Sequence, residues 1–121
     1  MIFKETKQKK EKLKIPAYTK GKIREAGLLI LDKEFNVEAW PQNNLAVRGR
    51  KFIGRKGVAD VIGYSRENGR IVMCEIKTVN DTFSKEQIDL LTDLHKCGGF
   101  ALVALQEGVK IVVKPFVQVK Y

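Results

Sequence analysis

The chain has 121 residues, 44% of them hydrophobic, and a formal net charge of +9. This length suits one domain with a real core, and the apolar content excludes a disordered chain. The excess of Lys and Arg favours a polyanionic partner, above all a nucleic-acid backbone, with an acidic membrane surface as the alternative. Two cysteines and one histidine predict neither a zinc site nor a disulfide framework. No apolar run approaches the ~20 residues of a membrane span, so we expect a cytoplasmic protein without a small-molecule cofactor.

Residues 1–17 form a lysine-rich stretch that we interpret as a basic N-terminal arm, and residues 18–121 as a single domain. The arm either contacts phosphate or is simply a solvated terminus. Thr19 is the expected N-cap of a helix that runs to Lys33 or Glu34. Its expected apolar face consists of Ile23, Ala26, Gly27, Ile30 and Leu31. Glu25 lies between the positions of Leu28 and Leu29, so we expect that it can face the sheet.

A first strand is predicted over residues 35–40, and Pro41 ends it. A polar, irregular loop over residues 42–56 follows, and it is rich in cations that directly precede the next strand. We expect this loop to hold a scissile nucleic-acid backbone, and each phosphate contact would add to a salt-dependent affinity. The alternative is an ordinary basic surface loop. The cations are Arg48, Arg50, Lys51, Arg55 and Lys56.

Two short strands over residues 58–64 and 71–76, joined by turn residues 66–69, are predicted to form a hairpin. They carry Asp60, Glu75 and Lys77, which a buried sheet would not select for stability. A two-residue loop at positions 67 and 68 would pair Asp60 with Glu75, and a loop at positions 68 and 69 would pair Asp60 with Lys77. Both registers place the three side chains on one face, whereas a three-residue loop would separate them.

Carboxylates that meet across a strand pair repel each other unless a positive charge lies between them. Asp60 and Glu75 therefore suit Mg²⁺ or Mn²⁺, which prefer oxygen ligands and retain water for substrate phosphate. Lys77 can orient a water molecule or stabilise charge on phosphorus, which is the chemistry of phosphodiester hydrolysis. The alternative is a set of exposed salt bridges on a solvated sheet face.

The second half of the chain predicts a helix followed by a buried strand. Ser84 and Gln87 have capping-box spacing, Phe83 and Ile88 have hydrophobic-staple spacing, and Gly98-Gly99 end the helix. Lys85 in the first turn opposes the helix dipole, which suggests a phosphate-facing role. A strand over residues 100–105 then implies a parallel crossover. A further strand over residues 109–113 ends at Pro115, and residues 116–121 alternate apolar and polar side chains.

Several of these motifs together resemble the PD-(D/E)xK nuclease superfamily, and more narrowly the stand-alone VRR-NUC domain. The resemblance covers about residues 23–105, and Ala59 stands where the family often has proline. It implies an α/β, restriction-endonuclease-like αβββαβ core with a mixed central sheet flanked by helices. The motifs that carry it are Gly-Val-Ala-Asp ending at Asp60, Glu75-Ile76-Lys77, Ser84 to Gln87, and Gly98-Gly99.

The resemblance implies a nuclease that needs Mg²⁺ or Mn²⁺ and hydrolyses DNA. Asp60, Glu75 and the Ile76 carbonyl would bind the metal, Lys77 would position water, and Gln87 would approach the site from the helix start. Glu25 on the first helix is the candidate for an additional ligand, with an ordinary surface glutamate as the alternative.

The resemblance to stand-alone VRR-NUC domains also implies a homodimer, and phages often carry domains of this kind. Two rival functions remain open. The first is a dimeric resolvase that cuts Holliday junctions. The second is a module that binds nucleic acid without cutting it.

Overall fold

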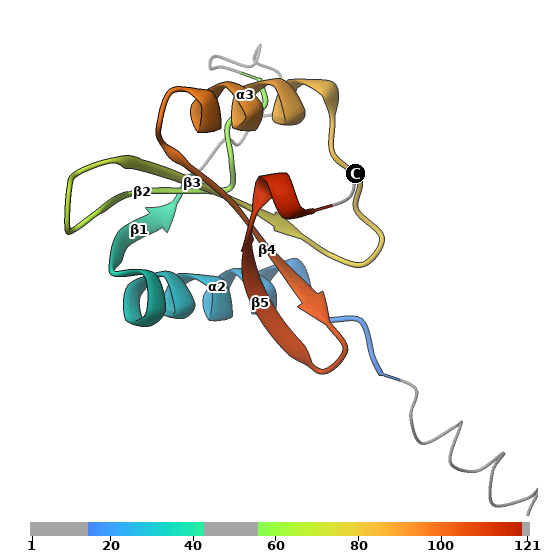
Figure 1. Ribbon diagram of the computed structural model, residues 1–121. Coiled ribbons are helices and arrows are strands. Elements are labelled where there is room, and N and C mark those ends of the chain that lie inside the picture. Colours follow the sequence, from blue (N-terminus) through green and yellow to red (C-terminus); the bar gives the residue numbers. More distant parts are fainter. Residues whose placement is uncertain (1–14, 43–55, 120–121) are drawn as a thin grey trace, which may run out of the picture.

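A computed structural model describes residues 15–42 and 56–119. Within them, two α-helices and a short 3-10 helix accompany a five-stranded sheet (Figure 1). The chain passes through α2 (Lys20–Phe35), β1 (Val37–Pro41), β2 (Val61–Ser65), β3 (Ile71–Lys77), α3 (Lys85–Lys96), β4 (Phe100–Glu107), β5 (Lys110–Pro115) and η1 (Phe116–Gln118). No described helix has both the length and the apolar character needed to cross a membrane.

The strands lie in the sheet in their sequence order, from β1 to β5. All neighbours are antiparallel except β3 and β4, which are parallel and are connected through α3. The expected α/β class with a mixed sheet is therefore confirmed. The helices lie on opposite faces of the sheet, so the fold has three layers (Figure 1).

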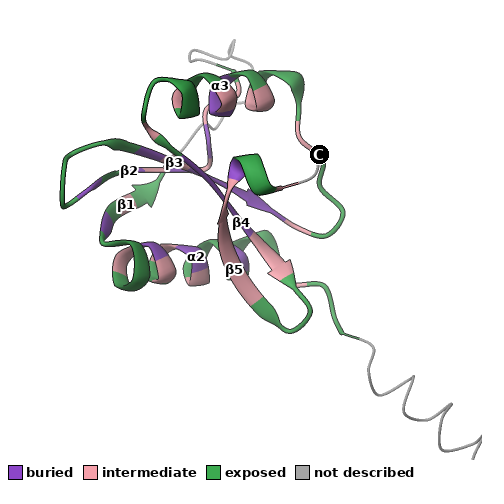
Figure 2. Ribbon diagram, viewed as in Figure 1, coloured by how far each residue is buried: buried purple, intermediate pink, exposed green. Residues whose placement is uncertain are grey.

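The core is divided between the two faces of the sheet. Toward α2, the buried side chains of the helix meet those of β1 to β4, with Ile23 and Leu31 fully buried. Toward α3, Leu91 packs with Val103 and Phe116. Side chains alternate along a strand, so Val72, Cys74 and Ile76 of β3 face α2 while Met73, Glu75 and Lys77 face α3. Most of β3 is buried (Figure 2).

Helix α2 begins at the predicted N-cap, since the Thr19 side chain accepts a hydrogen bond from Lys22 N. It continues through Phe35, and Asn36 in the left-handed conformation caps its end, so β1 starts at Val37 and not at the predicted Phe35. Gly27 allows α2 to approach the sheet closely, because an added Cβ would lie 3.1 Å from the Ala104 Cβ.

The β2–β3 hairpin has one of the two predicted registers, the one that places Asp60 opposite Glu75, but its loop differs from the prediction. Val61 pairs with Cys74 and Ile62 with Met73. Continuing this register by one residue places Asp60 opposite Glu75. Ser65 N donates to Arg70 O, so residues 66–69 form a four-residue loop, with Gly69 at a φ of 73°. The prediction of a two-residue loop was wrong. An even number of loop residues nevertheless preserves the alternation of side chains, so the polar residues stay on one face.

The segments near the two termini pack onto the domain. Residues 116–118, in the stretch where apolar and polar side chains alternate, form η1, and Phe116 is buried in the core on the α3 side. Near the N-terminus, Gln106 accepts a hydrogen bond from Tyr18 N and donates one to Pro16 O. Pro16 therefore contacts the folded domain through the side chain of Gln106.

Candidate active site

The candidate site lies where β2 begins and β3 ends, on the face of the sheet that α3 covers in part. Glu75 and Lys77 are two residues apart on β3, and Asp60 directly precedes β2 opposite Glu75. Glu75 is 1% exposed and Lys77 is 8% exposed, although charged side chains are rarely buried to this degree without partners. The structure therefore brings together the three residues that the sequence singled out.

Asp60 is fixed from three directions. Its backbone carbonyl accepts a hydrogen bond from Gln42 N at 2.7 Å, which ties it to the end of β1. Its carboxylate accepts a hydrogen bond from Ile76 N at 3.1 Å and forms an ion pair with Lys20 Nζ at 3.3 Å. The sheet and the first turn of α2 thus hold the carboxylate against β3.

Glu75 is the most unusual side chain in the described structure. Its Oε1 accepts a hydrogen bond from Gln87 Nε2 at 3.1 Å, but its buried Oε2 has no hydrogen-bond donor among the described residues. Burial, reinforced by the neighbouring Asp60 carboxylate, raises the pKa of Glu75 to about 9. A buried carboxylate oxygen without a donor is costly, so this position favours a proton or a cation.

The two carboxyl groups form a coupled pair. Burial by itself would raise the pKa of Asp60, but hydrogen bonds from Glu75 and Ile76 N, together with the Lys20 ammonium, outweigh it and lower this pKa. The pair therefore favours a proton on Glu75 next to an ionised Asp60. A divalent cation between the same oxygens would replace that proton.

Lys77 is held beside the pair by the loop that leads into α3. Its Nζ donates to Thr82 O at 2.8 Å and to Gln87 Oε1 at 3.0 Å, and it lies 4.6 Å from the centre of the Phe83 ring. An ammonium group has three N–H donors, and the hydrogen bonds to described residues use two of them. The third can reach a water molecule or a phosphoryl oxygen.

Gln87 has both of the roles that the sequence left open. The capping box is confirmed, because the Ser84 side chain accepts from Gln87 N at 3.1 Å and Gln87 Oε1 accepts from Ser84 N at 2.9 Å. The same side chain bridges Lys77 and Glu75. The helix cap therefore also fixes the geometry of the site.

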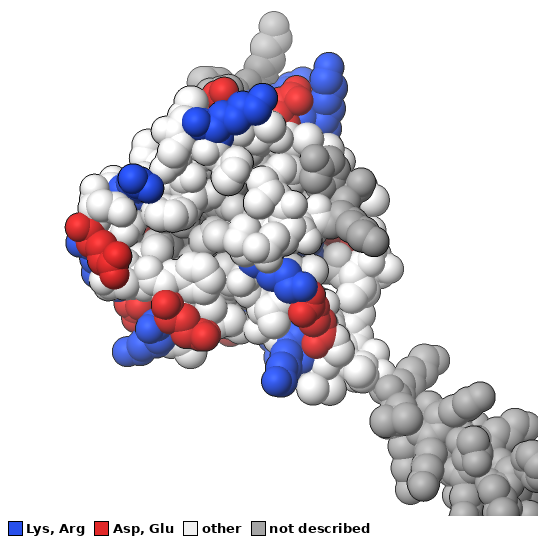
Figure 3. All heavy atoms as spheres, in the orientation of Figure 1, with Lys and Arg blue, Asp and Glu red and all other residues white. Residues whose placement is uncertain are grey.

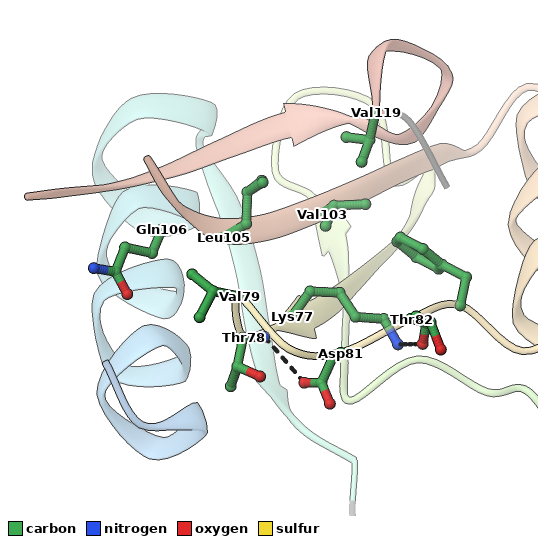
Figure 4. A pocket seen from close by; sticks show the side chains of 10 residues that line it. Lys77, Thr78, Val79, Asp81, Thr82, Val103, Leu105, Gln106 and Val119 are labelled. Carbon is green, nitrogen blue, oxygen red and sulfur yellow. Dashed lines mark hydrogen bonds between the residues drawn. The ribbon is translucent and has the colours of Figure 1, made fainter. Parts of the chain in front are cut away.

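A pocket of about 320 Å³ opens beyond the end of β3, next to Lys77 (Figure 4). The loop after β3 forms one wall, with Asp81 accepting a hydrogen bond from Thr78 N. Val103, Leu105 and Val119 form an apolar wall opposite. Lys77 extends along this pocket, with its ammonium turned toward Thr82 (Figure 4). The aliphatic part of Lys77 is therefore buried while its charged end stays beside the carboxylates.

The donor set fits a small, hard cation. Within the described residues there is no group of three or more His, Cys, Asp or Glu side chains that could hold a metal ion. Mg²⁺ needs fewer protein ligands, because one or two carboxylates, water and substrate phosphate complete its coordination. The N–H and C=O of a strand residue point to the same neighbouring strand. Since Ile76 N points to Asp60, the Ile76 carbonyl also points to this side, as the resemblance implies.

Glu25 does not face the sheet, contrary to our expectation. Ile23, Gly27 and Leu31 are the buried positions of α2. A residue midway between Ile23 and Gly27 projects from the opposite side of the helix, because successive residues are 100° apart. Glu25 is accordingly exposed. Lys20, one turn earlier, is the α2 residue that reaches the site.

The predicted nucleic-acid contacts are only partly described. Lys56 and Lys85 are exposed, whereas Arg48, Arg50, Lys51 and Arg55 lie outside the described residues. Within the described residues, acidic side chains match Lys and Arg in number, so the whole positive excess belongs to residues 1–14, 43–55 and 120–121. Figure 3 shows the same balance on one face, where positive and negative side chains lie beside each other around an uncharged centre.

Sequence reasoning missed Lys20 and the Thr82 carbonyl. No local signal marks either of them, since Lys20 reaches Asp60 only through the path of α2 across the sheet. Cys74, which precedes Glu75 in the sequence, faces α2 and is fully buried. Burial raises the pKa of its thiol to about 12, which favours the protonated, unreactive form.

We compared the chain with protein-family models, with curated proteins and with solved structures, and none of the three comparisons gave a match.

Proposed function

We propose that the protein is a divalent-metal-dependent nuclease that hydrolyses DNA phosphodiester bonds. The observation that carries this proposal is the buried Glu75 beside the half-buried Asp60, because Glu75 Oε2 has no donor among the described residues and Lys77 lies at the next position on the same face. Burying a carboxylate and an ammonium costs stability, and binding of a cation and of phosphate is a function that accounts for this cost. The order of the described elements, αβββαβ followed by β5, also supports a restriction-endonuclease-like core.

A bound Mg²⁺ or Mn²⁺ would supply Lewis-acid stabilisation of the charge on the phosphoryl oxygens. Asp60, Glu75 and the Ile76 carbonyl would hold it. Lys77 uses its remaining N–H to orient the attacking water, and Gln87 fixes the distance between Lys77 and Glu75. Water adds to phosphorus and loses a proton to solvent, one P–O ester bond breaks, and the leaving oxygen takes a proton from solvent.

The net charge supports DNA as the polyanion, since each Lys or Arg that meets a phosphate releases counterions. Because the described residues carry balanced charge, we expect residues 1–14 and 43–55 to provide most of the non-specific affinity. Raising the salt concentration should therefore weaken DNA binding while leaving the affinity for Mg²⁺ much less affected.

The test is a cleavage assay on linear, nicked, flap and four-way DNA with Mg²⁺, with Mn²⁺ and with EDTA. We expect metal-dependent cutting, and we expect Lys77→Ala to lower its rate by roughly 10³-fold, the equivalent of several kcal/mol of lost transition-state stabilisation. Lys96→Ala is the matched control, because Lys96 is an exposed lysine in the last turn of α3. DNA that is bound but intact under every metal condition would contradict the proposal and favour a binding module.

A further inference from the structure

The face of the sheet that carries the site also carries uncovered aromatic side chains. Side chains from β1, β2 and β3 that point to the α3 side form rows across these strands, two residues apart along each strand. The row of Asp60 and Glu75 is followed by the row of Trp40, Ile62 and Met73, and then by the row of Tyr64 and Ile71. The aromatic rows therefore start directly beside the carboxylates.

These side chains remain accessible because α3 packs on β4 and η1, away from β1 and β2 (Figures 1 and 2). Trp40 is 43% exposed, Tyr64 is 45% exposed and Ile71 is 57% exposed. The Trp40 and Tyr64 rings contact each other edge to face, with centroids 6.4 Å apart. The contact between the two rings restricts their orientation, and part of each ring remains exposed to solvent.

We propose that this aromatic surface, formed by Trp40, Tyr64 and Ile71, binds unpaired nucleobases by stacking, next to the phosphate that the site cuts. The inference deepens the proposed function, on which it rests, by naming a substrate class: single-stranded DNA, or the unpaired arm of a flap or fork. Aromatic side chains on an open sheet face are a common platform for unpaired bases, because every base has a π-face.

The position and the size of the aromatic surface favour unpaired nucleobases as its ligand. Adjacent rows are about 7 Å apart along the strands, so a base on Trp40 would lie about one nucleotide from a phosphate held at Asp60. Each exposed aromatic ring offers roughly 75–125 Å², which matches the face of a base. A stable dimer needs about 800 Å² per partner, far more than this surface supplies. Two copies, each with a net charge of +9 over the whole chain, would also repel each other, whereas a polyanion is complementary to that net charge.

The acidic residue beside the aromatic surface, Glu38, is compatible with binding of a nucleic acid there. Glu38 lies opposite Tyr64 in the same row, but its carboxylate forms an ion pair with Arg66 at 2.7 Å. Phosphate repulsion at this edge is therefore small. The remaining carboxylates nearby are Asp60 and Glu75, which a divalent cation would neutralise.

The chain contains a single tryptophan, so its fluorescence reports on this surface alone. The full-length protein is titrated in EDTA with oligothymidylate and, separately, with a blunt duplex of equal length. We expect the single strand to quench Trp40 emission and the duplex to quench it far less. Single-strand affinity is measured in parallel by the anisotropy of a labelled strand. Trp40→Ala and Tyr64→Ala should each weaken it roughly 5- to 150-fold, while Trp40→Phe should keep most of it.

Leu29 on the exposed side of α2 gives matched controls, because it is 60% exposed and lies on the opposite layer. Leu29→Ala should not change single-strand affinity. In the Trp40→Phe/Leu29→Trp double variant, emission should stay unchanged when the strand binds. Binding without quenching of Trp40 would overturn the inference, and so would a micromolar dimer that Trp40→Ala dissociates.

Because the titration requires no cleavage, quenching in a protein that never cuts DNA would contradict only the proposed nuclease. Cutting without quenching would contradict only the stacking surface.

Discussion

The two faces of β3 carry opposite chemistry. Toward α2 the strand presents Val72, Cys74 and Ile76, all fully buried among apolar neighbours. Toward α3, one residue further along each time, it presents Glu75 and Lys77, which are almost as deeply buried but polar. The α2 face stabilises the fold, and the α3 face holds the site at a cost in stability. This division places the site on a strand that is fixed from behind by a conventional core.

The largest expected effect on stability comes from a change on the α2 face. Leu31→Ala should lower the free energy of unfolding by about 2–5 kcal/mol, because Leu31 is fully buried and its truncation leaves a cavity. Urea denaturation measures this loss. Metal affinity at a temperature where the variant is still folded should equal that of the wild type. A variant that folds stably but no longer binds metal would show that the two faces are not separable.

Glu75→Gln tests the other face of β3, the one that points toward α3. Folding raises the pKa of Glu75 from about 4.5 to about 9. Without metal, its contribution to stability is fully present below pH 4.5 and is lost as the pH rises toward 9, because the unfolded chain releases the proton first. Glu75→Gln should flatten this decline while abolishing cleavage. Melting temperatures from pH 5 to pH 9 measure this decline in stability. If the melting temperature of the variant fell with pH as steeply as that of the wild type, Glu75 would not be the group that causes the decline.

Saturating Mg²⁺ should also reduce the decline in the wild type, because it binds the ionised form. The Glu75→Gln variant should show little of this metal effect. The melting profiles with and without Mg²⁺ therefore show whether the pH dependence comes from protonation of Glu75 or from another group in the molecule.

The smallest expected effect separates the two roles of Gln87. Ser84→Ala and Gln87→Ala each remove part of the capping box, so each should lower the free energy of unfolding by about 1 kcal/mol. Only Gln87→Ala also removes the bridge between Lys77 and Glu75. We therefore expect similar melting temperatures but a lower cleavage rate for Gln87→Ala alone. Equal rates would leave Gln87 with a capping role only.

Much of this arrangement follows from local sequence signals. Alternation along two strands joined by an even loop is sufficient to bring Asp60, Glu75 and Lys77 together, whichever even loop forms. The capping box at Ser84 and Gln87 is equally local. These are short-range patterns, and the structure confirms them.

The parts that the sequence could not predict depend on how elements pack. Lys20 forms its ion pair with Asp60 because α2 begins beside the start of β2. The orientation of α2, with Ile23, Gly27 and Leu31 toward the sheet, exposes Glu25 to solvent. The strand patterns do not distinguish Trp40 and Tyr64 from other strand residues, and their proposed role follows from their exposure where α3 does not cover the sheet. Helix orientation is a tertiary property, and no single segment of this chain encodes it.

The most direct test of the central claim, that Asp60 and Glu75 hold a divalent cation, is Mn²⁺ binding followed by electron paramagnetic resonance. We expect the wild type to remove one Mn²⁺ per chain from the free-ion signal, in competition with Mg²⁺, and we expect Asp60→Asn to lose this binding. Asp93→Asn, which changes an exposed acid of α3 that does not line the pocket, is the control and should bind as the wild type does. Equal Mn²⁺ binding by the wild type and Asp60→Asn would contradict the account.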